Sequence, residues 1–313
     1  MPKPSADLDL RLVRYFTVLA QHRRFVSAAE ELRITQPSLS RQISKLETQV
    51  GARLLERTAR GSRLTEAGEA FLPRAKALLR SAAHATAAAR TAAQPQRITI
   101  GYTADLLITA AVRHMRHHHP DADVHTSYLS WDSPREALLD HRVDAVVTRL
   151  PLTTDGMAVT TLYAEARVLA VPLDHYLAGR ESVTLDDIAD EPLPRVPDPA
   201  WNAYWRIDPR PDGRPAPGGP LAQVAEDKLE FVASGQAVAI MPATARLRPD
   251  ITTIPLHGVD PGHVVLATRA ADPNHLLAAF RRSARTHLTG PARPQQRPGR
   301  PRSSSGSHVG RLD

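Results

Sequence analysis

Residues 25–51 read FVSAAEELRITQPSLSRQISKLETQVG, and this stretch decides the fold of the N-terminal part of the chain. It predicts a short helix over 28–33 and a longer helix after Thr35, whose hydroxyl can cap the helix by accepting a bond from an early amide. Pro37 stands in the first turn, where its missing N–H is not needed, and Gly51 is the residue type that commonly ends a helix. A short helix, a brief turn and a longer helix together predict a helix-turn-helix.

The longer helix has two different faces. Leu39, Ile43, Leu46 and Val50 follow one another at steps of four, three and four and form an apolar face that packs inward. The opposite face carries amide, hydroxyl and guanidinium groups, which hydrogen-bond base edges and phosphates. An ordinary solvated face of a three-helix packet is the alternative. The residues of this helix that are predicted to contact DNA are Gln36, Pro37, Ser38, Ser40, Arg41 and Lys45.

A strand–turn–strand wing is predicted over 54–65, with the turn at 58–62. The wing offers Arg57, Arg60 and Arg63, which suit contacts to the DNA backbone or the minor groove, and Arg57 and Arg60 are predicted to bind DNA. The charge distribution agrees, because residues 1–90 carry 16 Lys and Arg against 8 Asp and Glu, whereas residues 91–290 carry 19 against 24. A basic N-terminal part indicates a polyanionic partner, and an acidic middle indicates a different task.

The same residues carry a family resemblance that runs in order through about sixty positions. The segments 25–32, 36–43, 54–57 and 64–68, together with Gly51, resemble the DNA-binding module of LysR-type transcriptional regulators. The resemblance implies a winged helix-turn-helix that binds double-stranded DNA, in a regulator that a small-molecule effector controls. The family's DNA contacts carry over to Gln36, Pro37, Ser38, Ser40, Arg41 and Arg60.

Residues 65–93 are rich in alanine and predict one long helix, which Thr65 can cap and in which Pro73 should kink or loosen a turn. A helix with many small residues can pack closely against a copy of itself, although a plain spacer is also compatible with the sequence. The resemblance implies the family's linker helix, which pairs antiparallel, so a homodimer or homotetramer is expected. RNA polymerase is a further expected partner of such a regulator.

Residues 94–290 alternate predicted strands and helices, beginning with a strand over 97–103 and a helix over 104–118. This order predicts a parallel sheet with right-handed crossovers, an α/β fold class. The resemblance implies a two-lobed effector domain similar to periplasmic binding proteins, with two crossing strands near 164–168 and 261–265. The expected parts of the chain are a winged helix-turn-helix over 1–64, a dimerisation helix over 65–93, the effector domain over 94–290 and a disordered basic tail over 291–313.

A ligand in such a fold lies between the lobes, at the carboxyl ends of the strands. Thr103 follows the first strand, beside the predicted N-terminus of the helix over 104–118, where backbone amides attract anions. Asp105 opposes an anion there, and Trp131 stands where the family usually has a second Ser or Thr. The residues predicted to bind the effector are Thr103, Asp105, Ser130, Trp131, Thr148, Arg149, Val196 and Met241.

Two features leave alternatives open. Trp201, Tyr204 and Trp205 lie in a Pro- and Gly-rich stretch, and they either form a lid over the cleft or pack the stretch onto its own lobe. His114 and His118 have the i, i+4 spacing of two metal ligands, but no carboxylate is arranged with them, so a solvated helix face is favoured. No metal and no cofactor is therefore predicted.

Composition limits the classes of function. The chain has no cysteine, which excludes disulfides, thiolate metal sites and cysteine nucleophiles. No stretch reaches the roughly 18 apolar residues of a membrane span, and the N-terminus lacks a signal-peptide pattern, so a cytoplasmic protein without a membrane partner is expected. Enzyme motifs such as the P-loop and G-x-S-x-G are absent, so no enzyme is predicted.

Two other functions stay as alternatives. A DNA-tethered α/β enzyme would need carboxylates near the cleft, for which Asp105, Asp132 and Asp144 are the candidates. A nucleoid-associated architectural protein would bind DNA with little sequence preference. The tail residues 297–302, RPGRPR, resemble the core of an AT-hook, although a passive basic tail is the simpler interpretation.

Overall fold

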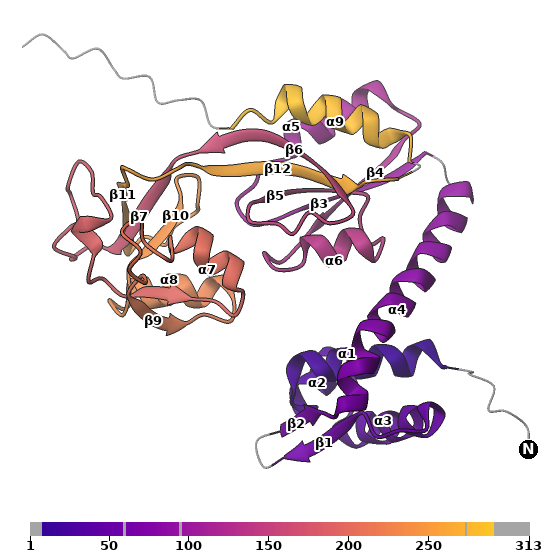
Figure 1. Ribbon diagram of the computed structural model, residues 1–313. Coiled ribbons are helices and arrows are strands. Elements are labelled where there is room, and N and C mark those ends of the chain that lie inside the picture. The colour runs from indigo at the N-terminus through magenta and orange to yellow at the C-terminus, as the bar shows by residue number, and fades with distance from the viewer. Residues whose placement is uncertain (1–7, 59–60, 94–95, 273, 291–313) are drawn as a thin grey trace, which may run out of the picture.

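The computed structural model describes residues 8–58, 61–93, 96–272 and 274–290. Figure 1 shows a small helical module, one long helix and an α/β domain of two lobes along the chain. This is the fold class predicted from the sequence. Arg60 and the predicted basic tail over 291–313 lie outside the described residues. Among the helices of the described part, none is long and apolar enough to cross a membrane.

The N-terminal module packs three helices and a hairpin around one apolar core, in which Phe16 is fully buried. Thr35 caps the third helix by accepting a bond from the Ser38 amide at 3.4 Å, and Gly51 ends it in the left-handed conformation, as predicted. The second helix begins at Phe25 rather than at residue 28, and Phe25 packs against the core. The elements are α1 (Leu10–His22), α2 (Phe25–Glu31), α3 (Gln36–Val50), β1 (Leu55–Thr58) and β2 (Gly61–Leu64).

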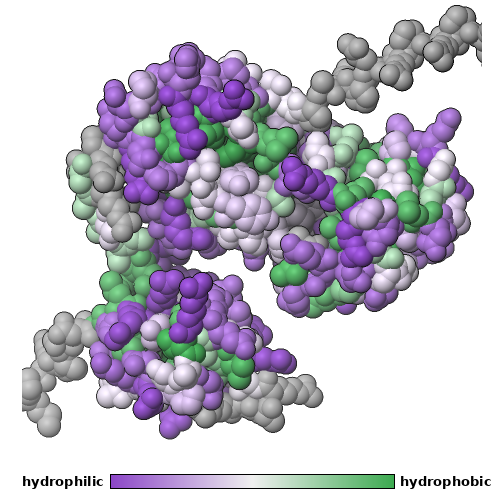
Figure 2. Space-filling view, turned by 180° about the vertical axis from the view of Figure 1, so that it is seen from behind, coloured by the Kyte–Doolittle hydropathy of each residue, from purple (hydrophilic) through white to green (hydrophobic). Residues whose placement is uncertain are grey.

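Helix α4 (Glu66–Ala93) connects the module to the α/β domain and, at 1.5 Å per residue, is about 42 Å long. The Gly68 amide donates to the Thr65 hydroxyl at 3.0 Å and caps the helix, which continues through Pro73. Ala75 is buried in the core of the module. Figure 2 shows apolar colour on the part of α4 between the two bodies of the protein, so much of this alanine-rich surface is uncovered within one chain.

The first lobe is built on a five-stranded sheet in the order β4-β3-β5-β12-β6. The strands β3, β4 and β5 are parallel, as predicted, and β12 is antiparallel to its neighbours β5 and β6. Helices α5 and α9 cover one face of the sheet and α6 covers the other (Figure 1). The elements are β3 (Arg97–Tyr102), α5 (Thr109–His118), β4 (Asp123–Tyr128), α6 (Pro134–Leu139), β5 (Ala145–Arg149), β6 (Met157–Glu165), β12 (Gly262–Arg269) and α9 (Leu276–His287).

The second lobe has a three-stranded sheet in the order β10-β7-β11 and a separate parallel pair, β8-β9. Its core contains Leu169, Val171 and Trp205. The elements are β7 (Arg167–Pro172), η1 (Asp186–Ile188), β8 (Leu193–Arg195), α7 (Pro199–Trp205), β9 (Gly218–Leu221), α8 (Ala225–Ala233), β10 (Ala239–Pro242) and β11 (Ile251–Pro255).

Two segments connect the lobes. Strand β6 passes into β7 through Ala166, and residues 256–261 lead from β11 to β12. Gly262 pairs with Glu165, so the two crossings lie side by side. The structure therefore has the pair of crossings that the sequence predicts.

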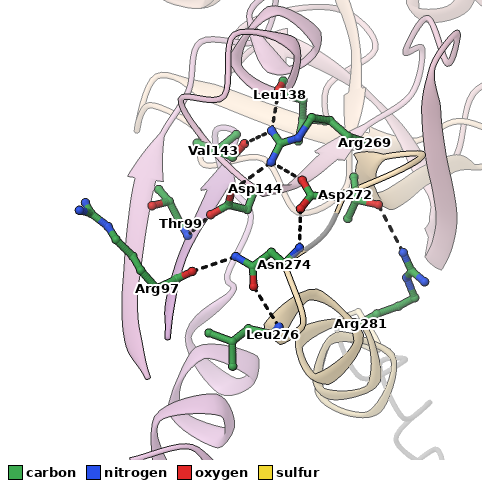
Figure 3. Close-up of polar contacts among 11 residues, drawn as sticks. Arg97, Thr99, Leu138, Val143, Asp144, Arg269, Asp272, Asn274, Leu276 and Arg281 are labelled. Carbon is green, nitrogen blue, oxygen red and sulfur yellow. Dashed lines mark hydrogen bonds and ion pairs between the residues drawn. The ribbon is translucent and has the colours of Figure 1, made fainter. Parts of the chain in front are cut away.

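A buried polar network fixes the first lobe at the end where β3 and β5 begin (Figure 3). Arg269 donates to the carbonyl oxygens of Leu138 and Val143 at 2.6 and 2.7 Å and pairs with Asp144 at 3.0 Å. It also pairs with Asp272, at the start of the segment that leads to α9. Burial raises the pKa of the Asp144 carboxyl, and the charge of Arg269 opposes that shift. The network holds α6 to the end of the sheet at which the parallel strands begin, opposite their carboxyl ends.

Candidate DNA-binding and effector sites

Helix α3 separates apolar from polar side chains as predicted. Leu39, Ile43 and Leu46 are buried against the core of the module. Arg41 and Lys45 form no ion pair with another described residue, so their charges are available to a ligand. Among the predicted contact residues, Ser38 and Ser40 are half-buried, and those that are exposed are Gln36, Pro37, Arg41 and Lys45.

The wing lies beside α3, at the end of the molecule far from the α/β domain (Figure 1). Strands β1 and β2 pair antiparallel, with Arg57 opposite Ser62. The Ser62 amide donates to the carbonyl oxygen of Arg23 at 2.8 Å, which fixes the wing to the end of α1. Arg60 lies outside the described residues, and its DNA contact stays a prediction.

Thr103 and Thr148 meet at the carboxyl ends of β3 and β5. The Thr103 hydroxyl donates to the Thr148 hydroxyl at 3.3 Å, and both residues are buried. The helix predicted to begin beside Thr103 begins at Thr109 instead, because the chain first makes an irregular turn in which Asp105 has a φ of 60°. The prediction of an anion site at a helix N-terminus beside Thr103 is therefore wrong.

Asp105 lies at a hollow between the two lobes. It lines a groove of about 680 Å³ between α5 of the first lobe and α8 of the second, together with Tyr128, Glu226 and Arg246. Thr103 is turned toward Thr148 instead. Thr103 and Asp105, two residues apart in the sequence, therefore have different surroundings.

Arg149 is engaged by the protein itself. Its Nε donates to Glu165 Oε1 at 2.5 Å, its Nη1 to the Ala104 carbonyl oxygen at 2.6 Å and its Nη2 to the Thr244 hydroxyl at 2.9 Å. The Thr244 hydroxyl also donates to Glu165 at 2.6 Å, and the Glu165 side chain is only 1% exposed. This network ties the first lobe to the second beside a crossing. Binding of an effector by Arg149 stays a prediction.

Two tryptophans meet between the lobes. Trp131 follows β4 in the first lobe and Trp201 lies on α7 in the second, and their ring centroids are 4.7 Å apart in an edge-to-face arrangement. Lys228 of α8 places its Nζ 5.3 Å from the centre of the Trp201 ring. Burial lowers the pKa of Lys228 to about 8, and Lys228 forms no ion pair with another residue of the described part. An aromatic pair beside an unpaired cation can hold a flat or apolar molecule with an acidic group.

Helix α7 extends this contact toward both crossings. Trp201 stacks on Trp205 at 5.7 Å, and Trp205 is 4% exposed. The Arg167 guanidinium lies 4.3 Å from the centre of the Tyr204 ring, and the His263 amide donates to the Tyr204 hydroxyl at 3.2 Å. Since Arg167 begins β7 and His263 lies in β12, α7 touches both crossing strands. Trp205 therefore packs this stretch onto its own lobe, whereas Tyr204 also reaches β12 and Trp201 also reaches the first lobe.

The other three predicted effector residues have separate surroundings. Ser130 donates its hydroxyl to Asp132 at 2.5 Å within its own loop. The backbone of Val196 exchanges two hydrogen bonds with the Asn202 side chain, and Val196 lines a small hollow beside α7. Met241 packs into a small apolar cluster of the second lobe. Val196 thus belongs to the α7 side of the site, whereas Ser130 and Met241 are engaged elsewhere.

Glu165, Thr244 and Lys228 were absent from the sequence prediction. Lys228 carried a signal, because it is the only lysine after Lys76. The contacts of Glu165 and Thr244 depend on how the two lobes pack, which no local sequence pattern indicates.

The histidines of α5 stack on one another. The ring centroids of His114 and His118 are 4.0 Å apart, and His287 of α9 lies 4.5 Å from His114. Within the described ranges, no group of three or more His, Asp or Glu is arranged to hold a metal ion. That no metal or cofactor is needed stays a prediction from the sequence.

Comparisons with known proteins agree with this two-part organisation. The family described as bacterial regulatory helix-turn-helix protein, lysR family, matches residues 10–69, and the LysR substrate binding domain matches residues 92–289. The probable cat1 operon transcriptional activator of Acinetobacter lwoffii is 33% identical over 264 residues, which cover 78% of this chain and 84% of that protein. AlsR of Bacillus subtilis is 35% identical over 203 residues, 63% of this chain and 67% of that protein.

A solved structure is also similar. The crystal structure of a full-length BenM mutant is 27% identical, with a TM-score of 0.52, and the match covers 89% of this chain and 95% of that one. A helix-turn-helix module followed by a two-lobed binding domain defines a class of bacterial transcriptional regulators. The chain belongs to the LysR family of these regulators. It is a DNA-binding transcriptional regulator with a substrate-binding effector domain.

Proposed function

We propose that this regulator recognises a specific operator with α3 and the wing, and that a small molecule bound between its lobes switches it. The observation that carries the proposal is the two-faced helix α3, whose polar face is exposed while Leu39, Ile43 and Leu46 are buried. A helix with exposed amide and guanidinium groups on one face can lie in the major groove and read base edges.

The residues of this face divide into readers of bases and contacts to the backbone. Gln36 reads adenine and Arg41 reads guanine, because an amide and a guanidinium each form two hydrogen bonds with those bases. Lys45 binds phosphates, which attract a cation without regard to sequence. Further contacts come from Pro37, Ser38, Ser40, Arg57 and Arg60.

Assembly into a homodimer or homotetramer places two or more such modules on one operator. The support is the exposed, alanine-rich half of α4, whose small side chains allow a second copy of the helix to approach closely (Figure 2). Linked modules bind two half-sites with an affinity far above that of one module.

The effector lies where Trp131 and Trp201 meet, with its acidic group toward Lys228. Thr103 and Thr148 supply hydroxyls at the strand ends of the first lobe. A ligand that separates the two indoles moves α7, which touches both crossing strands, and so changes the angle between the lobes. Such a coupling typically amounts to about 1–3 kcal/mol.

The protein acts by stoichiometric binding rather than by turnover. Asp144, one of the carboxylates that an enzyme would need, is held by Arg269 at the opposite end of the sheet from the strand carboxyl ends. The regulator works in the cytoplasm, where its DNA lies, and contacts RNA polymerase at the promoter.

Selection of binding sites from a random DNA pool by the full-length protein, followed by footprinting, tests the proposal. The expected result is enrichment of an interrupted palindrome, protected equally on both half-sites. A nucleoid-associated protein would enrich no sequence, and its affinity would fall steeply and uniformly with salt for every DNA. That second result would contradict the proposal.

A further inference from the structure

A second hollow lies within the second lobe and borders one of the two crossings. It has a volume of about 340 Å³ and lies between residues 184–189, 210–215 and 257–258. The last of these segments belongs to the stretch 256–261, which leads from β11 to β12. A ligand in this hollow therefore touches chain that sets the relative position of the lobes.

Arg210 lines this hollow and is left without a partner. The residue is 8% exposed, and none of its three guanidinium nitrogens forms a hydrogen bond within the described part of the chain. Burial lowers the pKa of Arg210, and the neighbouring charge of Arg206 adds to the effect. Because arginine stays protonated in proteins, a buried guanidinium with neither water nor a counter-ion destabilises the fold.

The nearest carboxylates are already bound to other cations. Asp208 pairs with Arg206 at 2.7 Å, and Asp212 pairs with Arg214 at 2.6 Å. The Arg206 guanidinium is held further by two backbone carbonyl oxygens. Of the two buried arginines at this place, Arg206 is therefore paired through both of its terminal nitrogens, with only its Nε left over, whereas no guanidinium nitrogen of Arg210 has a partner in the described part of the chain.

We propose that this hollow binds a small oxyanion, with carboxylate or phosphate chemistry, through Arg210. The planar guanidinium fork matches both groups with two parallel hydrogen bonds. Protein atoms cover the three guanidinium nitrogens, so binding requires Arg210 to rotate its outer torsions until these nitrogens face the hollow. Arg214 and His257 line the same hollow and add donors, whereas Asp186 opposes a second negative charge, so the ligand carries one oxyanion group.

Thermal unfolding of the full-length protein with sodium phosphate, sodium acetate and sodium chloride at equal ionic strength tests this site. Phosphate or acetate should raise the Tm more than chloride does, and the rise should saturate with anion concentration. The anion that gives the larger rise shows whether the site prefers a phosphate or a carboxylate. Arg210→Gln should remove the additional rise in Tm that this anion gives over chloride. In a calorimetric titration it should raise the Kd for the anion at least tenfold. In chloride alone the variant should unfold at a higher temperature, because it removes an unpaired buried charge.

Phosphate is also expected to bind the exposed cations of the DNA-binding face, so the quantity compared is the change in Tm of each variant relative to that of the unaltered protein. Arg285→Gln, on the exposed side of α9, is the matched control and should keep the full additional rise. Retention of the additional rise in Arg210→Gln overturns the site. A lower Tm of Arg210→Gln in chloride, without any anion effect in the unaltered protein, assigns Arg210 a structural role and also overturns it. None of these measurements uses DNA, so they stand apart from the test of operator recognition.

Discussion

The indole rings of Trp131 and Trp201 come from different lobes and meet edge to face at 4.7 Å. Trp201 stacks on Trp205, which lies in the core of the second lobe, and α7 contacts both crossing strands. One pair of side chains therefore joins the first lobe to a helix that contacts both crossing strands.

The first prediction concerns the energy of this pair. Trp131→Ala, Trp201→Ala and the double variant should show a coupling free energy of about 0.5–1.5 kcal/mol in denaturant unfolding, as aromatic pairs do. Trp205 is present in every variant, so its fluorescence follows the second lobe throughout. Strictly additive effects of the two substitutions would show that the rings do not interact.

The second prediction uses the unpaired charge of Lys228. Burial lowers its pKa to about 8, so the ammonium group is present below that pH and is lost as the pH rises through it. For the small acid that stabilises the protein most in a thermal-shift screen, the Kd should rise about tenfold between pH 7 and pH 9, because the competent fraction falls by that factor.

Two lysine variants separate this effect from general charge. Lys228→Gln should weaken binding of the acid at pH 7 and abolish the pH dependence of its Kd between pH 7 and pH 9. Lys76→Gln, exposed on α4, should leave both unchanged. A Lys228→Gln protein with unaltered affinity would place the acidic group elsewhere.

The third prediction concerns the buried pair of Arg149 and Glu165. Arg149→Met leaves the Glu165 carboxylate, 1% exposed, without its cation, and should lower the free energy of unfolding by about 3–5 kcal/mol. The double variant Arg149→Met/Glu165→Leu should recover most of that loss, since no uncompensated charge remains. Chemical denaturation of the four proteins measures both values, and a loss below about 1 kcal/mol in the single variant would argue against a tight pair.

The fourth prediction concerns Gly68, in the first turn of α4. A Cβ at this position would lie 2.1 Å from the carbonyl oxygen of Leu54, which is backbone and cannot move aside cheaply. Gly68→Ala should therefore destabilise the N-terminal module by about 1–3 kcal/mol, although alanine favours helices. Ala85→Gly, on the exposed part of the same helix, should cost only about 0.5–1 kcal/mol. A gain of stability in Gly68→Ala would disprove the close approach.

Local signals in the sequence were enough to predict the DNA-binding module. Thr35, Pro37 and Gly51 act within a few residues of their own positions, and the apolar spacing of Leu39, Ile43 and Leu46 identifies the buried face of α3 without tertiary information. The start of α5 was missed because the left-handed conformation of Asp105 breaks the helical pattern that the sequence suggests.

The effector domain was harder, because its contacts join segments that are distant in the chain. Thr103 and Thr148 were both predicted from their places at strand ends, and they do meet. Nothing local indicates that Arg149 would be bound by Glu165 and Thr244, or that Trp131 would find Trp201. These contacts follow from the packing of the lobes, which the order of strands and helices does not specify.

Affinity measured on variants of α3 tests most directly whether this helix reads the DNA sequence. The full-length protein, Gln36→Ala, Arg41→Ala and Lys45→Ala are titrated with the selected operator and with a scrambled DNA of equal length, at several salt concentrations. Gln36→Ala and Arg41→Ala should each lose about 1–3 kcal/mol on the operator and little on the scrambled DNA, whereas Lys45→Ala should weaken both alike and reduce the salt slope by about one. An unchanged ratio of operator to scrambled affinity in both Gln36→Ala and Arg41→Ala would contradict the account.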